Sequence, residues 1–231
     1  MCGDPSGAEP VSGSAYSDGM KLLLLSRFLG AVPDFLSTLK SDSLSDIRIA
    51  YINDAAKPLG DAPFVERERL QLQSLGYTLV PLTIGDGTAA DFSTALDTVD
   101  AVYVAGGMAD CLMAVLRSTG ADEVLIERVR AGLPYIGASA GAVIMGNSID
   151  TAIALDGYTD GTSLDDLSGL GLVDAVILPH ADGQLPPYPP EVIAEVARRL
   201  DGMLGLTMLP DDAALLVENR DVRMVASPAT A

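Results

Sequence analysis

Histidine occurs once in this chain of 231 residues, cysteine twice and lysine three times, and tryptophan is absent. A single histidine, His180, excludes a His-rich zinc site, and no group of residues has metal-ligand spacing. We therefore expect neither a metal nor another cofactor. Cys2 and Cys111 are too few for a disulfide framework, which favours free thiols in a reducing compartment.

Long apolar runs are also missing. Leu22 to Leu25 are followed directly by Ser26 and Arg27, so this run is too short for a signal sequence or a membrane span. We expect a soluble, cytoplasmic protein. Residues 1–19 are rich in Gly, Ser, Pro, Asp and Ala without periodicity, which predicts a disordered tail before a single α/β domain over residues 20–231.

Basic residues are scarce: 14 Lys and Arg face 32 Asp and Glu, for a net charge of −18. Such a surface repels nucleic acid and anionic membranes, which excludes both as partners. Two explanations of the acid excess stay open. One is adaptation to a salt-rich environment, where screening offsets self-repulsion, and the other is a compositional bias.

Apolar runs of strand length alternate with segments of helical periodicity up to about residue 150. This alternation, with strands that carry no polar face, predicts an α/β fold with a mostly parallel central sheet and helices on both faces. Strands are predicted at residues 20–26, 47–53, 77–84, 101–105 and 134–138, and helices at 28–40, 63–75, 92–96, 109–117, 122–131 and from about 140.

The composition of the chain changes after about residue 150. Residues 150–174 contain many Asp, Gly, Ser and Thr, which predicts loops with a short edge strand at 152–155. A strand at 175–178 and a helix at 191–200 follow. The end of the chain predicts three short strands, at 204–208, 213–217 and 222–226, with a hairpin turn at 218–221.

The pentapeptide Gly137-Ala138-Ser139-Ala140-Gly141 stands between a predicted strand and a predicted helix. It has the G-x-S-x-G pattern of a nucleophile elbow, in which Gly137 and Gly141 keep neighbouring backbone clear of an exposed serine hydroxyl. The amide of Ala140 can then stabilise a developing negative charge. The alternative is a small-residue turn that lets a helix pack close to a strand. The presence of both flanking elements favours the nucleophile.

A serine nucleophile needs a base within hydrogen-bond reach, and only His180 can serve as a histidine base. His180 follows a predicted strand and Pro179, which predicts that it lies at the same sheet edge as Ser139. The alternative is a histidine without a role. The acid that orients the imidazole is expected among Asp182, Asp211 and Asp212. Asp211 follows a strand end and is favoured, while Asp182 is better placed to shape the loop; each can also be a solvated surface charge.

Gly106 and Gly107 end the strand predicted to neighbour the elbow strand. They allow a substrate carbonyl to approach closely, so Gly107 is a natural second oxyanion donor. A plain strand-to-helix turn is the alternative. A phosphate site is disfavoured because neither G-x-G-x-x-G nor G-K-[ST] is present.

Taken in order, these motifs resemble peptidase family S51, which includes peptidase E (aspartyl dipeptidase) and, more distantly, cyanophycinase. The resemblance extends over about residues 20 to 226. It implies a flavodoxin-like fold similar to class I glutamine amidotransferases, and a Ser-His-acid triad in that chain order. It rests on V-A-G-G at 104–107, Y-I-G-x-S-A-G-A at 135–142, P-H at 179–180 and L-P-D at 209–211.

By this resemblance Ser139 is the nucleophile, His180 the general base and Asp211 the acid. Gly107 and Ala140 would supply oxyanion donors, with Gly106, Gly137 and Gly141 as supporting turns. Peptidase E has glutamate in an L-P-E-G context, where this chain has Asp211 and Asp212.

Strict specificity for N-terminal aspartate would need a cation in the pocket. No Lys or Arg occurs between Arg130 and Arg198, so the loops around the elbow and His180 offer none. We therefore expect a serine exopeptidase for dipeptides or short peptides without strict aspartyl specificity. Candidates for a cation from other loops are Arg27, Lys57 and Arg67.

Two other functions stay open: a non-catalytic sensor or binding protein on the same scaffold, and an esterase or amidase of small molecules. α/β folds of this kind often pair, which makes a homodimer a candidate assembly.

Overall fold

A computed structural model describes residues 19–39, 43–162, 164–219 and 221–229 of the chain. The predicted disordered tail lies outside these ranges except for its last residue, Gly19. In the ranges that are described, no helix has the length and apolar character needed to cross a membrane.

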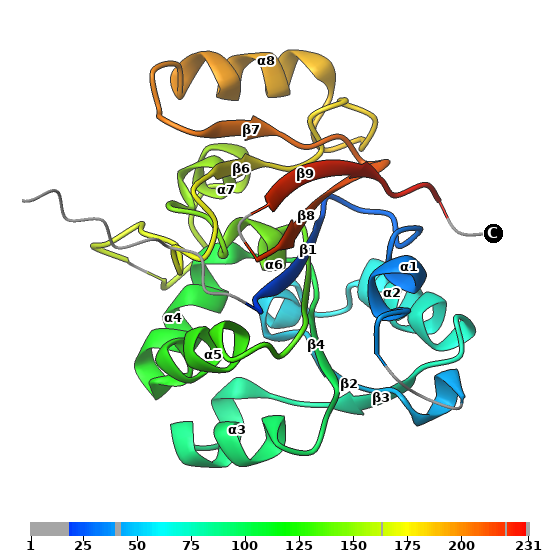
Figure 1. The fold of residues 1–231 in the computed structure, drawn as a ribbon. Coiled ribbons are helices and arrows are strands. Elements are labelled where there is room, and N and C mark those ends of the chain that lie inside the picture. The colour runs from blue at the N-terminus through cyan, green and yellow to red at the C-terminus, as the bar shows by residue number, and fades with distance from the viewer. Residues whose placement is uncertain (1–18, 40–42, 163, 220, 230–231) are drawn as a thin grey trace, which may run out of the picture.

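A seven-stranded sheet forms the centre of the molecule, in the order β3-β2-β4-β5-β1-β8-β9 (Figure 1). The first five strands of this order are parallel, and β8 and β9 continue the sheet in antiparallel fashion. The predicted mostly parallel α/β sheet is therefore confirmed. The strands are β1 (Lys21–Leu25), β2 (Arg48–Ile52), β3 (Thr78–Pro81), β4 (Ala101–Val104), β5 (Tyr135–Ala138), β8 (Ala213–Glu218) and β9 (Asp221–Ala226).

Helices cover both faces of this sheet (Figure 1). The α-helices are α1 (Val32–Leu36), α2 (Pro63–Ser74), α3 (Ala89–Leu96), α4 (Ala109–Thr119), α5 (Ala121–Arg130), α6 (Ala140–Val143), α7 (Asp150–Asp156) and α8 (Pro190–Arg199). The described residues also form the short 3₁₀ helices η1 (Leu44–Asp46), η2 (Asp54–Leu59) and η3 (Ile84–Asp86).

Local sequence signals set several helix boundaries. Thr88 and Asp91 form a reciprocal capping box at the start of α3. Pro63 occupies the first turn of α2, where its missing N–H leaves no bond unmade. Gly120 adopts φ 73° between α4 and α5, a conformation that glycine reaches without the cost of a Cβ.

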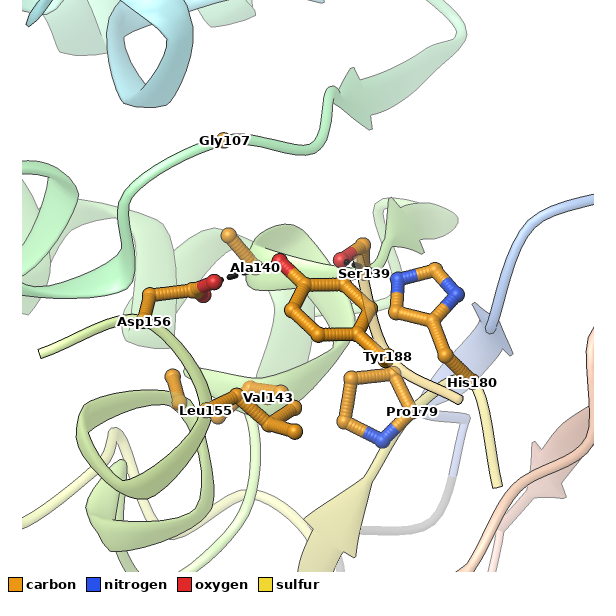
Figure 2. A pocket seen from close by; sticks show the side chains of 10 residues that line it. Gly107, Ser139, Ala140, Val143, Leu155, Asp156, Pro179, His180 and Tyr188 are labelled. Atoms are coloured by element: carbon orange, nitrogen blue, oxygen red, sulfur yellow. Dashed lines mark hydrogen bonds between the residues drawn. The ribbon is translucent and has the colours of Figure 1, made fainter. Parts of the chain in front are cut away.

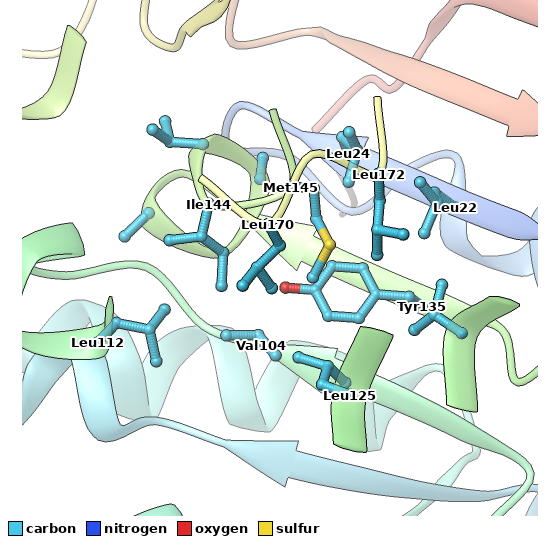
Figure 3. Packing of buried hydrophobic residues seen from close by; sticks show 14 of the residues in the cluster. Leu22, Leu24, Val104, Leu112, Leu125, Tyr135, Ile144, Met145, Leu170 and Leu172 are labelled. Atoms are coloured by element: carbon cyan, nitrogen blue, oxygen red, sulfur yellow. The ribbon is translucent and has the colours of Figure 1, made fainter. Parts of the chain in front are cut away.

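β1 shows how the sheet separates two apolar cores. Leu22 and Leu24 face the core covered by α3, α4, α5 and α6, part of which appears in Figure 3. Leu23 and Leu25 face the core under α1 and α2, because successive side chains of a strand point to opposite faces. All four leucines are fully or almost fully buried. Burial of each such side chain contributes about 1.5–3 kcal/mol to stability relative to exposure. Strand β5, which leads into Ser139 and pairs with β1, is therefore held in a well-packed part of the sheet.

The helix predicted over residues 28–40 is much shorter in the structure. Only α1 forms, and Lys40 lies outside the described residues. The cause is a tertiary contact. The amide of Phe28 donates to the backbone carbonyl of Asp211, and the amide of Gly30 donates to that of Pro228. A Cβ at Gly30 would lie 2.4 Å from the Pro228 carbonyl oxygen, so the C-terminal segment takes the place of a helical turn.

The prediction of an edge strand at residues 152–155 is wrong, because these residues belong to α7. Ile149 and Ala152 are buried in the core at a helical spacing, and Thr151 Oγ1 donates to the Ile177 carbonyl at 2.6 Å. An apolar run this short fits the 3.6-residue period of a helix as well as the two-residue period of a strand, so the sequence could not distinguish them.

A second sheet of two parallel strands, β6 (Val176–Leu178) and β7 (Leu206–Met208), packs above the main sheet with α8 (Figure 1). His180 was expected at the edge of the same sheet as Ser139. Its strand instead belongs to this second sheet, which contacts α6 and α7. The two residues therefore meet by packing between sheets.

Candidate active site

Ser139 occupies a sharp turn between β5 and α6, with φ 48° and ψ −110°. For a residue with a Cβ this conformation costs about 1–3 kcal/mol and persists only where the surroundings hold it. The Ser139 amide donates to the Leu25 carbonyl at 3.0 Å, and its own carbonyl accepts from Val143 at 2.9 Å. Tyr135 Oη donates to the Gly141 carbonyl at 2.7 Å, which ties the far end of the turn to β5.

The two flanking glycines are required by close backbone contacts. A Cβ at Gly137 would lie 2.3 Å from the Gly141 carbonyl oxygen, and one at Gly141 would lie 2.3 Å from the Val104 carbonyl oxygen. Neither gap can accept a methyl group without moving backbone. Gly137 and Gly141 therefore let α6 pack closely against β5 and β4, a role that a nucleophile elbow and a plain small-residue turn would share.

His180 connects the elbow to a buried carboxylate. Ser139 Oγ lies 3.1 Å from His180 Nε2, and His180 Nδ1 lies 2.7 Å from Asp211 Oδ1. His180 and Asp211 follow the paired strands β6 and β7, whose parallel register brings their carboxyl ends together. Of the other candidate acids, Asp212 is exposed, and one buried oxygen of Asp182 has no hydrogen-bond partner within the described part of the chain.

Asp211 is held by more than the imidazole. Arg27 Nη1 donates to its Oδ2 at 3.0 Å, and Ser26 Oγ donates to its Oδ1 at 3.1 Å. Burial opposes ionisation, but the hydrogen bonds from His180, Arg27 and Ser26 outweigh it and lower the pKa of the Asp211 carboxyl. The residue is therefore ionised at neutral pH and can stabilise a charged imidazole.

Ser26 was missed by sequence reasoning, although it directly follows β1 beside the elbow strand. Its hydroxyl accepts the backbone N–H of His180 at 2.7 Å while it donates to Asp211. Ser26 thus fixes both the backbone of the histidine and the carboxylate. Arg27, a candidate pocket cation, is engaged by Asp211 instead.

Gly107 adopts φ 144°, and a Cβ there would lie 2.3 Å from the Ala55 carbonyl oxygen. Met108 donates its amide to the same carbonyl at 2.7 Å, which fixes the loop after β4. Gly106 packs against Ser139, since a Cβ at Gly106 would lie 3.2 Å from the serine Cβ. The Ala140 amide opens α6 and so lacks an intrahelical acceptor. Gly107 and Ala140, the two predicted oxyanion donors, both line the same pocket as Ser139.

A narrow pocket opens over the elbow (Figure 2). Its volume of about 10 Å³ holds roughly one water molecule. Tyr188 covers His180, with ring centroids 5.2 Å apart and planes 18° from parallel, and its hydroxyl donates to Asp156. None of the lining residues is Lys or Arg: they are Gly107, Ser139, Ala140, Val143, Ala152, Leu155, Asp156, Pro179, His180 and Tyr188.

The other candidate cations do not line this pocket either. Lys57 Nζ binds Asp54 Oδ1 at 2.9 Å, and Arg67 is exposed on α2. In the described ranges, no three His, Cys, Asp or Glu side chains converge in a way that would hold a metal ion.

The model of peptidase family S51 matches residues 22–225 of this chain. The chain belongs to peptidase family S51. It is 29% identical over 201 residues to the uncharacterized peptidase Lmo0363 of Listeria monocytogenes, covering 87% of this chain and 96% of that one. It is 33% identical over 159 residues to the uncharacterized peptidase Lin0382 of Listeria innocua, covering 69% and 75% of the two chains.

A shorter match links the chain to peptidase E of Streptomyces coelicolor, with 48% identity over 56 residues, or 24% of this chain and 23% of the other. Among solved structures, a candidate peptidase E from Listeria monocytogenes superimposes with a TM-score of 0.78 at 28% identity. That comparison covers 90% of this S51 chain and 98% of the Listeria chain. The family resemblance read from the motifs is thus confirmed.

Proposed function

We propose that this S51 family member is a cytoplasmic serine exopeptidase that hydrolyses dipeptides or short peptides through an acyl-enzyme. The observation that carries the proposal is the continuous hydrogen-bonded chain from Ser139 through His180 to Asp211, with Ser139 at the turn between β5 and α6 in a pocket that Gly107 and Ala140 also line. This chain of contacts supports roles for Ser139 as nucleophile, His180 as base and Asp211 as orienting acid, the arrangement that acyl transfer requires.

In the first half of the reaction, Ser139 Oγ bonds to the scissile carbonyl carbon while His180 Nε2 takes its proton. The amides of Gly107 and Ala140 donate to the resulting oxyanion. The intermediate collapses as the carbon–nitrogen bond breaks, and His180 gives the proton to the leaving amine.

In the second half, water adds to the acyl-enzyme. His180 takes a proton from the water and returns it to Ser139 Oγ as the acyl–oxygen bond breaks, which releases the N-terminal product. The ionised Asp211 stabilises the imidazolium in both halves.

We further propose that the enzyme is not restricted to N-terminal aspartate. An acidic side chain in the pocket would need a cationic partner, and the lining residues include none. Arg27, on the adjoining loop, already neutralises Asp211. Neutral, small N-terminal residues are the better match to a narrow pocket with Val143, Ala152 and Leu155 in its wall.

Turnover of a library of short peptides by wild type and by Ser139→Ala tests the proposal. We expect kcat to fall by about 10³-fold or more in the variant, with an unchanged circular dichroism spectrum. Cleavage confined to Asp-X dipeptides would contradict the broader specificity. Turnover of esters alone would indicate an esterase, and absence of both turnover and fluorophosphonate labelling would indicate a binding protein.

A further inference from the structure

Arg27 lies just beyond the carboxyl end of β1, two residues after Leu25, beside the buried carboxylate that contacts His180. Its Nη1 donates to Asp211 Oδ2 at 3.0 Å, the oxygen that does not face His180. We infer that Arg27 is a positioning residue, which orients Asp211 and offsets its charge so that His180 stays an unprotonated base at lower pH than a lone carboxylate would allow. This inference rests on the proposed peptidase function and names a residue that sets the pH range of that function.

The contacts of Asp211 are divided between its two carboxylate oxygens. Oδ1 accepts from Ser26 Oγ at 3.1 Å and lies 2.7 Å from His180 Nδ1, whereas Oδ2 accepts from Arg27. Hydrogen bonds between charged groups are stronger than neutral ones, so rotation of the carboxylate away from this arrangement would break its strongest contacts. Arg27 therefore helps to keep Oδ1 directed at the imidazole.

The guanidinium of Arg27 is itself held by its neighbours. It lies over the ring of Phe28, 4.9 Å from the ring centroid, which is the geometry of a cation–π contact. The Phe28 amide donates to the backbone carbonyl of Asp211 at 3.2 Å, so the segment that carries Arg27 is joined to the acid through backbone as well as side chain. The positive charge is thus kept at a fixed place relative to His180, which a steady effect on its protonation requires.

The described surroundings of His180 contain more acidic than basic groups. Its acidic neighbours are Asp211 at Nδ1, Asp156 on α7 and Asp182 in the loop that follows. A nearby carboxylate favours the protonated imidazole, which cannot accept a proton from Ser139. The other side chains against the ring, Ser139 and Tyr188, are neutral. In the described ranges, Arg27 is the cation that pairs with this network, and its charge opposes protonation of the imidazole.

The pH dependence of two rates tests the inference: kcat/KM on short peptides, and labelling of Ser139 by a fluorophosphonate. Both rates should fall at low pH, where the base is protonated. In Arg27→Gln we expect this acid limb to move to higher pH by about 0.5–1 unit, a shift that solvent moderates because the Arg27 side chain is 36% exposed. Above the limb both rates should fall by only about 2–10-fold, since Ser26 still holds Oδ1. Arg27→Met also removes the charge and should show the same shift, so the test does not depend on the folding of one variant.

Two further variants separate charge from shape. Arg27→Lys keeps the charge without the planar fork, so its acid limb should stay within about 0.3 pH units of wild type. Arg67→Gln removes the same charge from an exposed position on α2 and should leave both profiles unchanged. An acid limb that does not move in Arg27→Gln and Arg27→Met, or that moves equally in Arg27→Lys or Arg67→Gln, would overturn the role of the Arg27 charge alone. A wild type that is neither labelled nor active would overturn the proposed peptidase function, and this inference with it.

Discussion

The half of the pocket that carries Ser139 comes from strand-to-helix turns of the main sheet, whereas the half that carries His180 and Tyr188 comes from the second sheet and its flanking loops. Backbone contacts too close for any Cβ fix the first half, both within the elbow, at Gly137, and between neighbouring segments, at Gly141 and Gly107. Hydrogen bonds between side chains far apart in sequence fix the second half, as when Ser26 holds both His180 and Asp211. Small substitutions in the first half should therefore lower the stability of the fold, whereas those in the second half should lower kcat.

The largest effect is expected from Gly137→Ala. The added Cβ would lie 2.3 Å from the Gly141 carbonyl oxygen, so backbone must move in the elbow itself. We expect activity to vanish and stability to fall by about 2–4 kcal/mol or folding to fail, as measured by urea unfolding.

Gly85→Ala is the matched control, because a Cβ there meets only Val115 Cγ2 at 3.4 Å, an ordinary contact. Normal activity and stability in Gly137→Ala would contradict the close-packed elbow. Loss of folding in Gly85→Ala as well would show that the effect is general to added methyl groups.

Next in size is Asp211→Asn, which keeps the shape of the acid but removes its charge. We expect kcat to fall by about 10³–10⁴-fold, because the amide neither stabilises the imidazolium nor holds the correct tautomer. The Arg27 guanidinium also loses its partner. Asp212→Asn, at the exposed neighbouring position, is the control and should leave kcat unchanged. The reverse pattern would assign the orienting acid to Asp212.

A smaller loss is expected from Ser26→Ala. The substitution leaves the buried amide of His180 without its acceptor and removes one donor to Asp211. As a positioning residue, Ser26 should affect kcat by about 10–100-fold with little change in KM. Fluorophosphonate labelling should slow in parallel.

Ser227→Ala is the comparison for this variant, since Ser227 is also buried and bridges Phe28 and Ala31 near the same segment. It should lower stability without the loss in kcat. Equal kinetic losses in both variants would assign Ser26 a structural role only.

Glu68 should affect stability alone, because it lies away from the pocket on α2 beside Tyr103. Burial raises the pKa of its carboxyl to about 8. The folded state therefore keeps a proton that the unfolded chain releases above its ordinary pKa, so the free energy of unfolding decreases as pH rises from about 4.5 toward 8.

Glu68→Gln removes this titration. Unfolding in urea should show the variant gaining stability relative to wild type as pH rises through this window, by a few kcal/mol at most, with kcat/KM unchanged. A constant difference between the two proteins from pH 4.5 to 8 would show that Glu68 ionises as readily as in the unfolded chain.

The sequence allowed the parallel sheet and the elbow to be predicted, because both leave local patterns: apolar runs such as that of β1, and glycines at fixed positions around Ser139. The pairing of β6 with β7 in a separate sheet leaves no such pattern. Asp211 could be favoured over Asp182 and Asp212 from its place after a strand, but its contact with the imidazole depends on the register of that second sheet.

The pocket residues Asp156 and Tyr188 could not be found in this way. Tyr188 lies in a proline-rich loop without periodicity, and Asp156 lies at the end of a helix that was mistaken for an edge strand. Their meeting is a result of tertiary packing of α7 against β6 and α8. Side chains brought together by such packing carry no signal in the local sequence.

Mass spectrometry after treatment with a fluorophosphonate tests the central claim most directly, that His180 activates Ser139 as a nucleophile. Wild type should acquire one adduct, mapped to the peptide that contains Ser139, and both Ser139→Ala and His180→Ala should acquire none on the same timescale. A wild-type protein that stays unmodified, or an adduct that persists in Ser139→Ala, would contradict it.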